Sequence, residues 1–466
     1  MLTRDDGWRT ESDSIGSLQV PADALYGVQT LRAVENFPIT GQRIPDEMIV
    51  SLAYIKKAAA VTNRAAGDLP ASIAQAIITA CDEIIAGKWH EQFIVDVIQG
   101  GAGTSTNMNA NEVIANRAIE LLGGVKGDYS LVHPNDHVNM SQSTNDVYPT
   151  CGRMTAIRLL SGLYEQLTLL KDTLSRQSWA FHNVIKIGRT QLQDAVPVRL
   201  GQTFHAYASC IERDIARIKT AEAEMHQVNL GGTAIGTHLN AGKTYVQNIV
   251  RNLSGISGLT LEPAEDCIDA TQNADGYAAL SGALKALAVN LSKISNDLRL
   301  MSSGPIGGFG DISLPSRQNG SSIMPGKINP VIPEVVNQIA FLVVGNDATI
   351  TMAAEAGQLE LNAFEPVLFN RLFGSITALT HGIHVLSTLC VQGITANQSR
   401  CRALVEKSSA LATVLCPVVG YTRASALAKR AIASGDSVRQ LAVQDHLVNE
   451  ANADAYFDVY SMTGEA

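Results

Sequence analysis

The sequence is poor in the features that mark several common classes of protein. Its seven cysteines are widely scattered and form no Cys-x-x-Cys pair, so we expect reduced thiols and neither a disulfide framework nor a cysteine-bound metal. No stretch reaches about 18 uninterrupted apolar residues, and the first residues contain no apolar core of signal-peptide length. We therefore expect a cytoplasmic protein without a membrane segment.

Basic residues are outnumbered in this chain. It contains 35 Lys and Arg against 44 Asp and Glu, which gives a formal net charge of −9, and no basic run interrupts this balance. Nucleic acid and anionic membrane surfaces are therefore not expected as partners. The net charge does not exclude a small anionic ligand, because a few well-placed cations and N–H groups can bind one locally.

Nucleotide-binding motifs are also missing. Gly326-Lys327 follows Gly320 at the wrong spacing for a phosphate-binding P-loop, and Ile328 stands where Ser or Thr is required. The segment 231–236 is likewise a poor dinucleotide fingerprint. Nucleotide binding is not predicted.

Aromatic residues make up only 5% of the chain, so its core must be built from aliphatic side chains. Apolar residues recur at three- and four-residue spacings over long stretches, which predicts amphipathic helices. These stretches run over about residues 147–184, 199–227, 271–302, 331–354 and 362–392. Helices of this length cannot cover their apolar stripes singly, so we expect them to pack as a bundle.

Several of the central helices are apolar on more than one side, for example over residues 280–291 and 335–345. A helix that is apolar all round needs neighbours all round. We therefore predict a homo-oligomer whose subunits share the central bundle.

The chain of 466 residues exceeds the roughly 250 to 300 residues at which a single core stops growing, so more than one domain is expected. We predict a mainly all-α protein with three domains. These are an N-terminal helical domain over 1–145, a central long-helix bundle over 146–397, and a small C-terminal helical domain over 398–466.

Four polar clusters lie at the edges of the long apolar stretches, at residues 100–109, 139–146, 188–197 and 320–329. In the first cluster Thr104 adds a hydroxyl to a glycine-rich turn, and in the second Ser143, Thr144 and Asn145 fall at the start of a long helix. Hydroxyls and amides at a helix start can bind an anion, and they can equally serve as ordinary helix caps.

The third cluster is predicted to be a polar turn between two long helices that presents Thr190 and Gln191. A plain connector would not usually carry so many hydrogen-bonding side chains. The fourth cluster is a loop bounded by glycines, which can change shape and close over a ligand. Its Lys327 supplies a compact cation and its Asn329 a donor for a carboxylate. Together the four clusters describe convergent donors for a small dianion.

The fourth cluster also carries a resemblance. Gly320-Ser-Ser-Ile-Met-Pro-Gly-Lys-Ile-Asn-Pro330 resembles the signature loop of the aspartase/fumarase superfamily, whose members eliminate a group β to a carboxylate. Only Ile328 departs from the valine that is usual there. The resemblance extends over nearly the whole chain, from Gly16 to Asn397.

Particular positions decide between branches of this superfamily. Thr144, Gln191 and Glu365 resemble the aspartate ammonia-lyase branch. The stretch from His133 to His137 resembles the fumarase branch, in which the equivalent of His137 belongs to a second, non-catalytic carboxylate site. A zinc pair formed by these two histidines is disfavoured by the intervening proline and the lack of a third ligand. A class II fumarate hydratase is thus the alternative enzyme, and a non-catalytic structural protein derived from a lyase is the alternative from another class.

The resemblance implies reversible deamination of L-aspartate to fumarate and ammonia by anti β-elimination through an enediolate, with Ser321 as the base. It implies two further sets of substrate-binding residues. The carboxylate next to Cβ would be bound by Thr104, Ser143, Thr144 and Ser322. The other carboxylate would be bound by Lys327, Asn329 and Thr190, with Asn145 and Gln191 toward the amino group.

The same resemblance implies a homotetramer in which each active site is built from three subunits. It implies no organic cofactor and no resident metal. Divalent-metal activation varies within the family and is left open.

Overall fold

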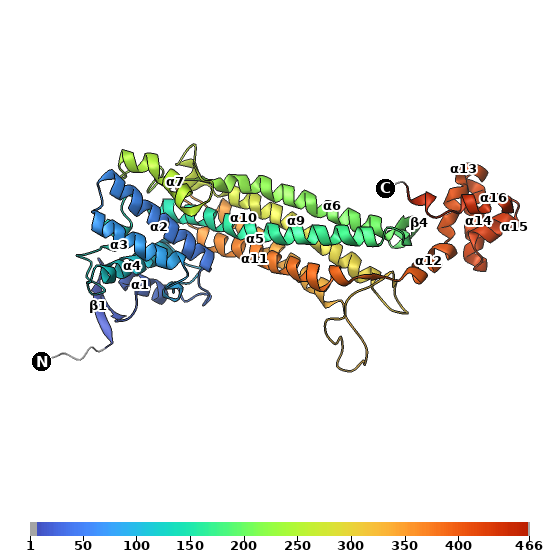
Figure 1. Cartoon of the computed structure of the whole chain (residues 1–466), viewed down its shortest axis with the longest axis horizontal. Coiled ribbons are helices and arrows are strands. Elements are labelled where there is room, and N and C mark those ends of the chain that lie inside the picture. Colours follow the sequence, from blue (N-terminus) through green and yellow to red (C-terminus); the bar gives the residue numbers. More distant parts are fainter. Residues whose placement is uncertain (1–6, 465–466) are drawn as a thin grey trace. The chain divides into compact units, whose positions relative to one another are not determined.

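The computed structural model describes residues 7–464, and most of them are helical (Figure 1). The strands among these residues form four separate two-stranded pairs, so the prediction of a mainly all-α fold is confirmed. All seven cysteines are free, as expected. The chain divides into two compact units. Unit 1 comprises residues 1–163, 217–285 and 342–378, and unit 2 comprises residues 164–216, 286–341 and 379–466.

Five long helices contribute residues to both units. They are α5 (Thr144–Ala180), α6 (Leu200–Glu222), α9 (Asp275–Met301), α10 (Val331–Glu355) and α11 (Glu365–Leu389). Each begins and ends within a few residues of a stretch predicted from apolar periodicity. In α5, for instance, Leu160, Leu163, Leu167, Leu170 and Leu174 are completely buried, which is the three- and four-residue spacing of one helix face.

Unit 1 contains the shorter N-terminal elements. They are β1 (Trp8–Ser12), β2 (Ser17–Pro21), α1 (Val28–Asn36), α2 (Asp46–Ala66), α3 (Ala71–Ile85), η1 (His90–Gln92), α4 (Thr104–Leu121), η2 (Pro134–Val138), η3 (Ala223–His226), β5 (Gln227–Val228), α7 (Lys243–Ser257), β6 (Glu262–Pro263) and α8 (Asp269–Gln272). Helix α2 packs against α3 and α7, and α3 packs against α4. Leu52, Ile55 and Ala59 of α2 are fully buried there.

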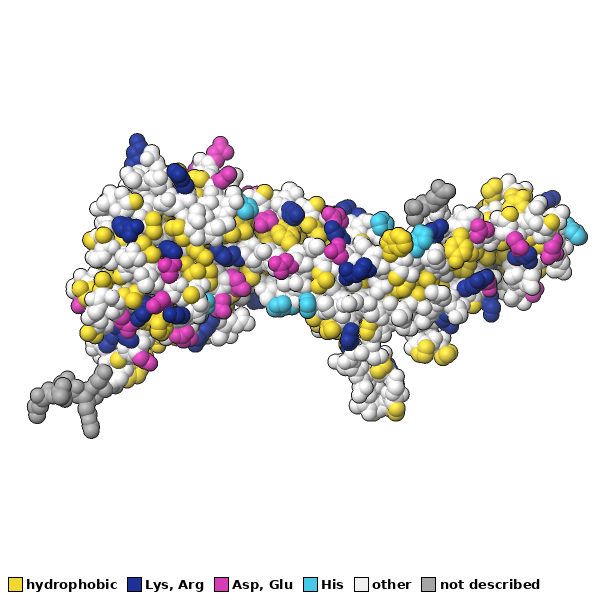
Figure 2. Space-filling view, viewed as in Figure 1, with side chains coloured by type: hydrophobic (Ala, Val, Ile, Leu, Met, Phe, Trp, Pro, Cys, Tyr) yellow, Lys and Arg dark blue, Asp and Glu magenta, His cyan; other side chains and the backbone are white. Residues whose placement is uncertain are grey.

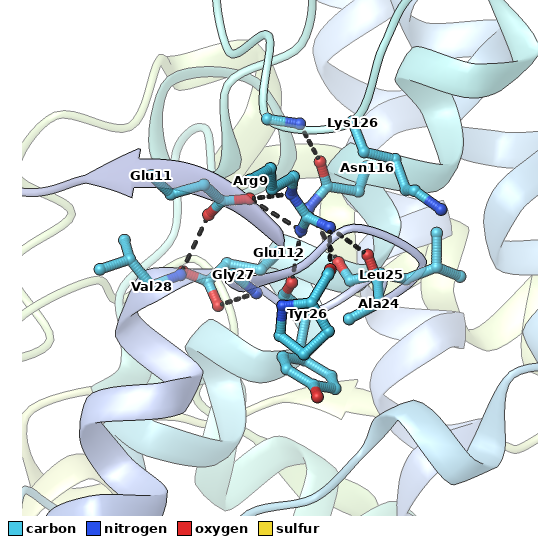
Figure 3. Close-up of polar contacts among 12 residues, drawn as sticks. Arg9, Glu11, Ala24, Leu25, Tyr26, Gly27, Val28, Glu112, Asn116 and Lys126 are labelled. Carbon is cyan, nitrogen blue, oxygen red and sulfur yellow. Dashed lines mark hydrogen bonds and ion pairs between the residues drawn. The ribbon is translucent and has the colours of Figure 1, made fainter. Parts of the chain in front are cut away.

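Two carboxylates fix the start of α1 (Figure 3). Glu112 of α4 accepts hydrogen bonds from the backbone N–H groups of Gly27, Gln29 and Thr30, and Glu11 of β1 accepts one from Val28. Negative charge at a helix N-terminus is favourable because the N–H groups there have no partner within the helix. Burial raises the pKa of Glu112 because it disfavours the charged form, and the hydrogen bonds from Gly27, Gln29 and Thr30 oppose this rise.

Unit 2 contains the C-terminal elements and two strand pairs. They are β3 (Ile185–Thr190), β4 (Gln193–Arg199), β7 (Ile312–Ser313), η4 (Val391–Gly393), β8 (Thr395–Ala396), α12 (Gln398–Lys407), η5 (Ser409–Leu415), α13 (Cys416–Val419), α14 (Tyr421–Ser434), α15 (Val438–Gln444), α16 (Glu450–Tyr456) and η6 (Ser461–Thr463). Short helices after residue 397 are as expected. The division into three domains stays a prediction.

The predicted polar turn over 188–197 is wrong in its local structure, because this segment belongs to the antiparallel hairpin β3–β4. The reason lies in packing. Ile185 and Ile187 of β3 are buried in the same cluster as Val405, Leu411 and Leu427 of the C-terminal helices. The hairpin is therefore one wall of the C-terminal core, a role that its own short sequence does not reveal.

Candidate active site

The first polar cluster forms the entry to α4. Gly101, Ala102 and Gly103 adopt left-handed φ values of 91°, 55° and 88°, so the backbone turns sharply before the helix begins at Thr104. Only glycine fits at position 103, because a Cβ there would lie 2.4 Å from the ring of Tyr148. The Thr104 hydroxyl donates to the carbonyl of Gly101 at 2.7 Å. The Thr104 side chain is exposed and faces a cavity of about 480 Å³ instead of the core.

The second cluster caps α5. Ser143 Oγ accepts a hydrogen bond from the N–H of Asn145 at 3.2 Å, and the Asp146 carboxylate accepts one from the N–H of Ser143 at 2.9 Å. Both contacts satisfy backbone N–H groups at the start of α5, as helix-capping side chains do. Thr144 Oγ1 accepts a hydrogen bond from Asn107 at 3.1 Å, and Asn145 Nδ2 donates to Ala234 O at 2.7 Å. Ser143 thus caps the helix, and the side chains of Ser143, Thr144 and Asn145 are half-buried.

The third cluster lies at the tip of the hairpin β3–β4. Thr190 pairs with Gln193, and the two residues between them, Gln191 and Leu192, have φ values of 54° and 61°. Such turns normally carry glycine or asparagine, because other side chains are strained at positive φ. Thr190 and Gln191 are both exposed. Strain at an exposed polar turn is typical of a functional site.

The fourth cluster is a loop closed at its base. Gly320 N donates to Lys327 O at 2.8 Å, and Asn329 Nδ2 donates to Gly320 O at 2.8 Å. Ser321 Oγ accepts hydrogen bonds from the backbone N–H groups of Ile323 and Met324, at 3.2 Å and 3.0 Å. Two N–H dipoles aimed at one hydroxyl oxygen favour negative charge on it.

This loop is open to solvent. Residues 322–328 are all exposed, and they include Ser322 and Lys327. The base of the loop lines a cavity of about 1760 Å³ within unit 2, to which Lys327 and Asn329 both contribute. Figure 1 shows the loop projecting from the helices of this unit. A loop that is closed at its base and free above it can move as a lid.

The hairpin tip and the loop have a common anchor in unit 2. Asp311 is completely buried and accepts two hydrogen bonds from Arg189, at 2.6 Å and 3.2 Å. Lys186 Nζ lies 3.4 Å from the same carboxylate, and burial lowers the pKa of Lys186. Arg189 directly precedes Thr190, and Asp311 directly precedes β7, which leads into the loop. Nothing in the sequence marked this buried ion triad.

The sequence-predicted residues fall into two groups. Unit 1 holds Thr104, Ser143, Thr144 and Asn145, and unit 2 holds Thr190, Gln191, Ser321, Ser322, Lys327 and Asn329. Within unit 1, Asn107 of α4 connects the α4 start to Thr144. Within unit 2, Thr190 and Gln191 do not line the cavity to which Lys327 and Asn329 contribute.

His133 caps the single π-helical turn η2 (Pro134–Val138), which contains His137. The N–H of His133 donates to His137 Nδ1 at 2.9 Å, and burial lowers the pKa of His137. His133, together with Arg32, lines the same cavity as Thr104, whereas His137 does not line it. The regular helix that a zinc pair would need is not formed.

Two buried ionisable residues of unit 1 were not among the site residues predicted from the sequence. Lys56 of α2 is completely buried beneath the second cluster. Glu365, the first residue of α11, is buried, and this raises its pKa to about 8. A periodicity argument can assign such positions to a helix face, but only the fold shows that their charged groups are buried.

Comparison with known proteins agrees with the mainly helical fold. A family model described as "Lyase" matches residues 16–345, and one described as "Fumarase C C-terminus" matches residues 411–464. Aspartate ammonia-lyase from Bacillus subtilis is 52% identical over 99% of this chain and 98% of its own length. The enzyme of the same name from Escherichia coli K12 is 48% identical over 97% of this chain and 96% of its own length.

Solved structures agree as well. A fumarate lyase:delta crystallin from Brucella melitensis, bound to cobalt, has a TM-score of 0.96 and 50% identity, covering 98% of this chain and 100% of that one. A class II fumarase from Schistosoma mansoni has a TM-score of 0.94 and 34% identity, covering 98% and 99%. The chain belongs to the aspartase/fumarase superfamily of lyases. Its relatives place it among the carbon–nitrogen lyases of that superfamily.

Proposed function

We propose that this chain deaminates L-aspartate reversibly to fumarate and ammonia. The observation that carries the proposal is the full-length similarity, near 50% identity, to proteins named aspartate ammonia-lyase. The loop with Ser321, Lys327 and Asn329 lies within the residues that the lyase family model matches. Formation of fumarate from aspartate, followed by its ultraviolet absorbance, tests the proposal directly. Turnover with aspartate and none with malate is the expected result.

The difficulty of the reaction is the charge that it develops. Removing a Cβ proton next to a carboxylate gives a doubly charged enediolate, so donors fixed around that carboxylate must stabilise it more than they stabilise aspartate. Loss of one such donor costs roughly 10²- to 10³-fold in rate. Thr104, Ser143, Thr144 and Ser322 supply hydroxyls for this purpose in the proposal.

Ser321 is the proposed base. Its alkoxide takes the Cβ proton, the electron pair passes into the adjacent carboxylate, and collapse of the enediolate forms the Cα–Cβ double bond as the C–N bond breaks. The N–H groups of Ile323 and Met324 point at Ser321 Oγ and supply the positive potential that an alkoxide needs. Closure of the exposed loop would exclude water from this step.

The remaining residues orient the substrate. Lys327, Asn329 and Thr190 bind the second carboxylate in the proposal, and Asn145 and Gln191 lie toward the amino group that leaves. The strained turn at Gln191 supports this assignment, because a side chain held at φ 54° in an exposed hairpin is more easily explained by a ligand than by stability.

Fumarate hydratase is the second candidate function. Similarity to the class II fumarase from Schistosoma mansoni and the turn η2, whose sequence resembles fumarases, favour it. Fumarate production from malate, with none from aspartate, would select this candidate. Inactivity of the assembled protein toward all succinyl substrates would instead favour a non-catalytic structural protein.

We propose a homotetramer with each active site built from three subunits. Exposed apolar side chains on two long helices support an assembly. On α9 they include Ala279 and Val289, and on α10 they include Phe341 and Met352, of which Phe341 is 67% and Met352 72% exposed. Figure 2 shows that hydrophobic side chains reach the surface on the face that it draws, interspersed with charged and other polar groups. Burying these faces between copies would remove them from water.

Two helical stretches among the described residues, Val331–Glu355 and Glu365–Gly393, are long and apolar enough to cross a membrane. We propose a bundle role for them, in a cytoplasmic protein that binds neither membrane nor nucleic acid. In α10 the buried Asp347 accepts hydrogen bonds from Ser281 and Lys285, at 2.8 Å and 2.6 Å, and such a network suits a protein interior. Recovery of the full activity in the soluble fraction without detergent is the expected result.

The proposed chemistry involves no electron or phosphate transfer, so it requires no organic cofactor. Among residues 7–464 no group of three or more His, Cys, Asp or Glu side chains is placed to hold a metal ion. We propose that any divalent cation acts as an activator and not as a resident group. Activity measured after chelation and after addition of Mg²⁺ or Co²⁺ tests this, and complete, metal-reversible loss on chelation would contradict it.

A further inference from the structure

A buried lysine lies beneath the segment that carries Ser143, Thr144 and Asn145. Lys56 is in the middle of α2 and its side chain is completely buried. Its Nζ donates to Asn139 Oδ1 at 2.8 Å and to Gln142 Oε1 at 3.0 Å. Burying an ammonium is costly unless its protons find acceptors, so a lysine in this position calls for an explanation.

Asn139 is a hub, because its side chain hydrogen-bonds both to Lys56 and to residues of α4. Its Oδ1 also accepts hydrogen bonds from Asn107 and Asn111 of α4, each at 3.2 Å. Asn107 Nδ2 in turn donates to Thr144 Oγ1 at 3.1 Å. The path from Lys56 to the hydroxyl of Thr144 therefore runs through two side chains, and every link in it is at least partly buried.

The second contact of Lys56 fixes the backbone of the same segment. Gln142 accepts from Lys56 with its oxygen and donates with its amide nitrogen to the carbonyls of Val138 and Met140, both at 3.0 Å. Asn139 Nδ2 donates to Gln142 O at 3.2 Å. These contacts hold the backbone of residues 138–142, which precede Ser143.

Asp146 fixes the other side. It is completely buried and accepts hydrogen bonds from the N–H groups of Ser143, Gly231 and Thr233, at 2.9 Å, 2.9 Å and 3.0 Å. Burial raises its pKa to about 6, and the charge of Lys56 opposes that rise. The segment is thus held between a buried cation and a buried carboxylate.

The surroundings of Lys56 contain more acceptors than donors. Asn107 Oδ1 and Asn111 Oδ1 are buried without a hydrogen-bond partner among the described residues. Burial lowers the pKa of Lys56 to about 7, and the groups that oppose this are Asp146, Cys81 and Cys151. A side chain without a hydrogen-bond donor in place of Lys56 would take away the donor to Gln142 Oε1 and one of the donors to Asn139 Oδ1.

We propose that Lys56 is a positioning residue for the substrate-binding segment 143–145, acting through Asn139 and Gln142. The ligand that this segment receives, a four-carbon dicarboxylate, rests on the function proposed above. The role of Lys56 itself does not, because it concerns the geometry of residues 139–146. Lys56 touches no substrate in this proposal and its effect is transmitted by the hub.

The test compares Lys56→Met with Thr62→Val. Thr62 lies on the same helix and is also buried, and its side chain hydrogen-bonds to Ala58 O and Asn252, which lie outside residues 139–146. For each assembled variant, kcat/KM for aspartate and amide hydrogen exchange over residues 139–147 are measured. A displaced binding segment predicts a roughly hundredfold lower kcat/KM and lost protection in Lys56→Met, with Thr62→Val close to wild type.

A folded Lys56→Met protein with wild-type kcat/KM and wild-type exchange over residues 139–147 would overturn the proposal. If the wild-type chain makes no fumarate from aspartate, the proposed function fails, and the exchange measurement still decides the role of Lys56. Should Lys56→Met not assemble, Asn139→Ala tests the hub from its other end. Unchanged activity and protection in that variant would overturn the proposal equally.

A double-mutant cycle separates positioning from a direct action of the charge. If Lys56 acts through Asn139 and Gln142, Lys56→Met has little further effect on kcat/KM in an Asn139→Ala/Gln142→Ala background. If its charge acts on the substrate directly, the two losses multiply, and the positioning proposal is wrong.

Discussion

Among the hydroxyls of the four polar clusters, that of Ser321 is distinguished by its hydrogen-bond donors. Two consecutive backbone N–H groups, of Ile323 and Met324, converge on Oγ. Ser321→Ala should therefore lower turnover of aspartate by several orders of magnitude and leave assembly and KM largely unchanged. Steady-state fumarate formation measures this effect.

Ser434→Ala provides the control, because Ser434 Oγ also accepts a backbone N–H, from Asp436, in an exposed turn after α14. It should retain wild-type turnover. A Ser321→Ala enzyme near the wild-type rate would show that another group removes the proton.

Glu365 predicts a pH dependence of stability. Burial raises its pKa from 4.5 to about 8 in the folded chain, so the folded state binds the proton more tightly than the unfolded state. The resulting stabilisation is fully present below about pH 4.5 and is lost as the pH rises to about 8. The free energy of unfolding of Glu365→Gln should therefore rise, relative to that of wild type, by on the order of 4 kcal/mol between pH 4.5 and pH 8.

Denaturant unfolding of both proteins at several pH values measures that difference. The exposed carboxyl of Glu355 supplies the control, since Glu355→Gln should show no comparable trend. A stability difference between wild type and Glu365→Gln that is independent of pH would contradict the assignment.

At the scale of single residues, the sequence predicts polar groups in surface motifs better than buried charges. Thr104, Ser143 and Lys327 could be selected because glycines and hydroxyls surround them at the ends of apolar stretches. Lys56 and Asp311 sit in stretches that periodicity assigns to the core or to a loop. Their roles depend on partners 83 and 122 positions away in the chain, and no local pattern encodes such pairs.

The buried ion triad that anchors the hairpin β3–β4 should contribute strongly to the stability of the fold. Asp311 pairs with Arg189 and Lys186, and all three are largely buried. Asp311→Ala leaves two buried cations without their partner, which should cost about 3–5 kcal/mol. Urea unfolding measures the loss.

The exposed pair of Arg402 and Glu406 on α12 is the matched control, because Glu406→Ala removes an ion pair that water already screens. It should change stability little. Equal effects of the two substitutions would contradict the view that the triad anchors the hairpin.

The long helices could be predicted from the sequence because each repeats its apolar spacing over more than twenty residues, as α5 does with its buried leucines. The hairpin β3–β4 could not. The two apolar residues of β3, Ile185 and Ile187, are too few to distinguish a strand from a helix end, and their partners lie in the C-terminal helices. Short elements of this kind are decided by tertiary packing.

For the whole molecule, the exposed face of α10 predicts an obligate assembly. Phe341 is 67% exposed, and its neighbours at three- and four-residue spacing on α10 are uncharged, namely Asn337, Gln338, Val344 and Gly345. Phe341→Asp should yield dissociated chains without activity, because a charge cannot be buried between subunits. Light scattering and fumarate formation, measured on the same sample, test this.

Val125→Asp is the control, since Val125 is 78% exposed in the loop after α4, outside the long helices. This variant should assemble and remain active. A Phe341→Asp protein that is monomeric and fully active would contradict an active site built from several subunits.

The central claim is that hydroxyl and amide groups from remote segments surround one dicarboxylate. The most direct test is a crystal structure of the assembled protein with succinate bound. The account predicts that Thr104, Ser143, Thr190 and Lys327, contributed by different subunits, lie within hydrogen-bonding distance of the succinate carboxylates. Succinate bound away from these residues, or the four residues on surfaces that do not face one another, would contradict it.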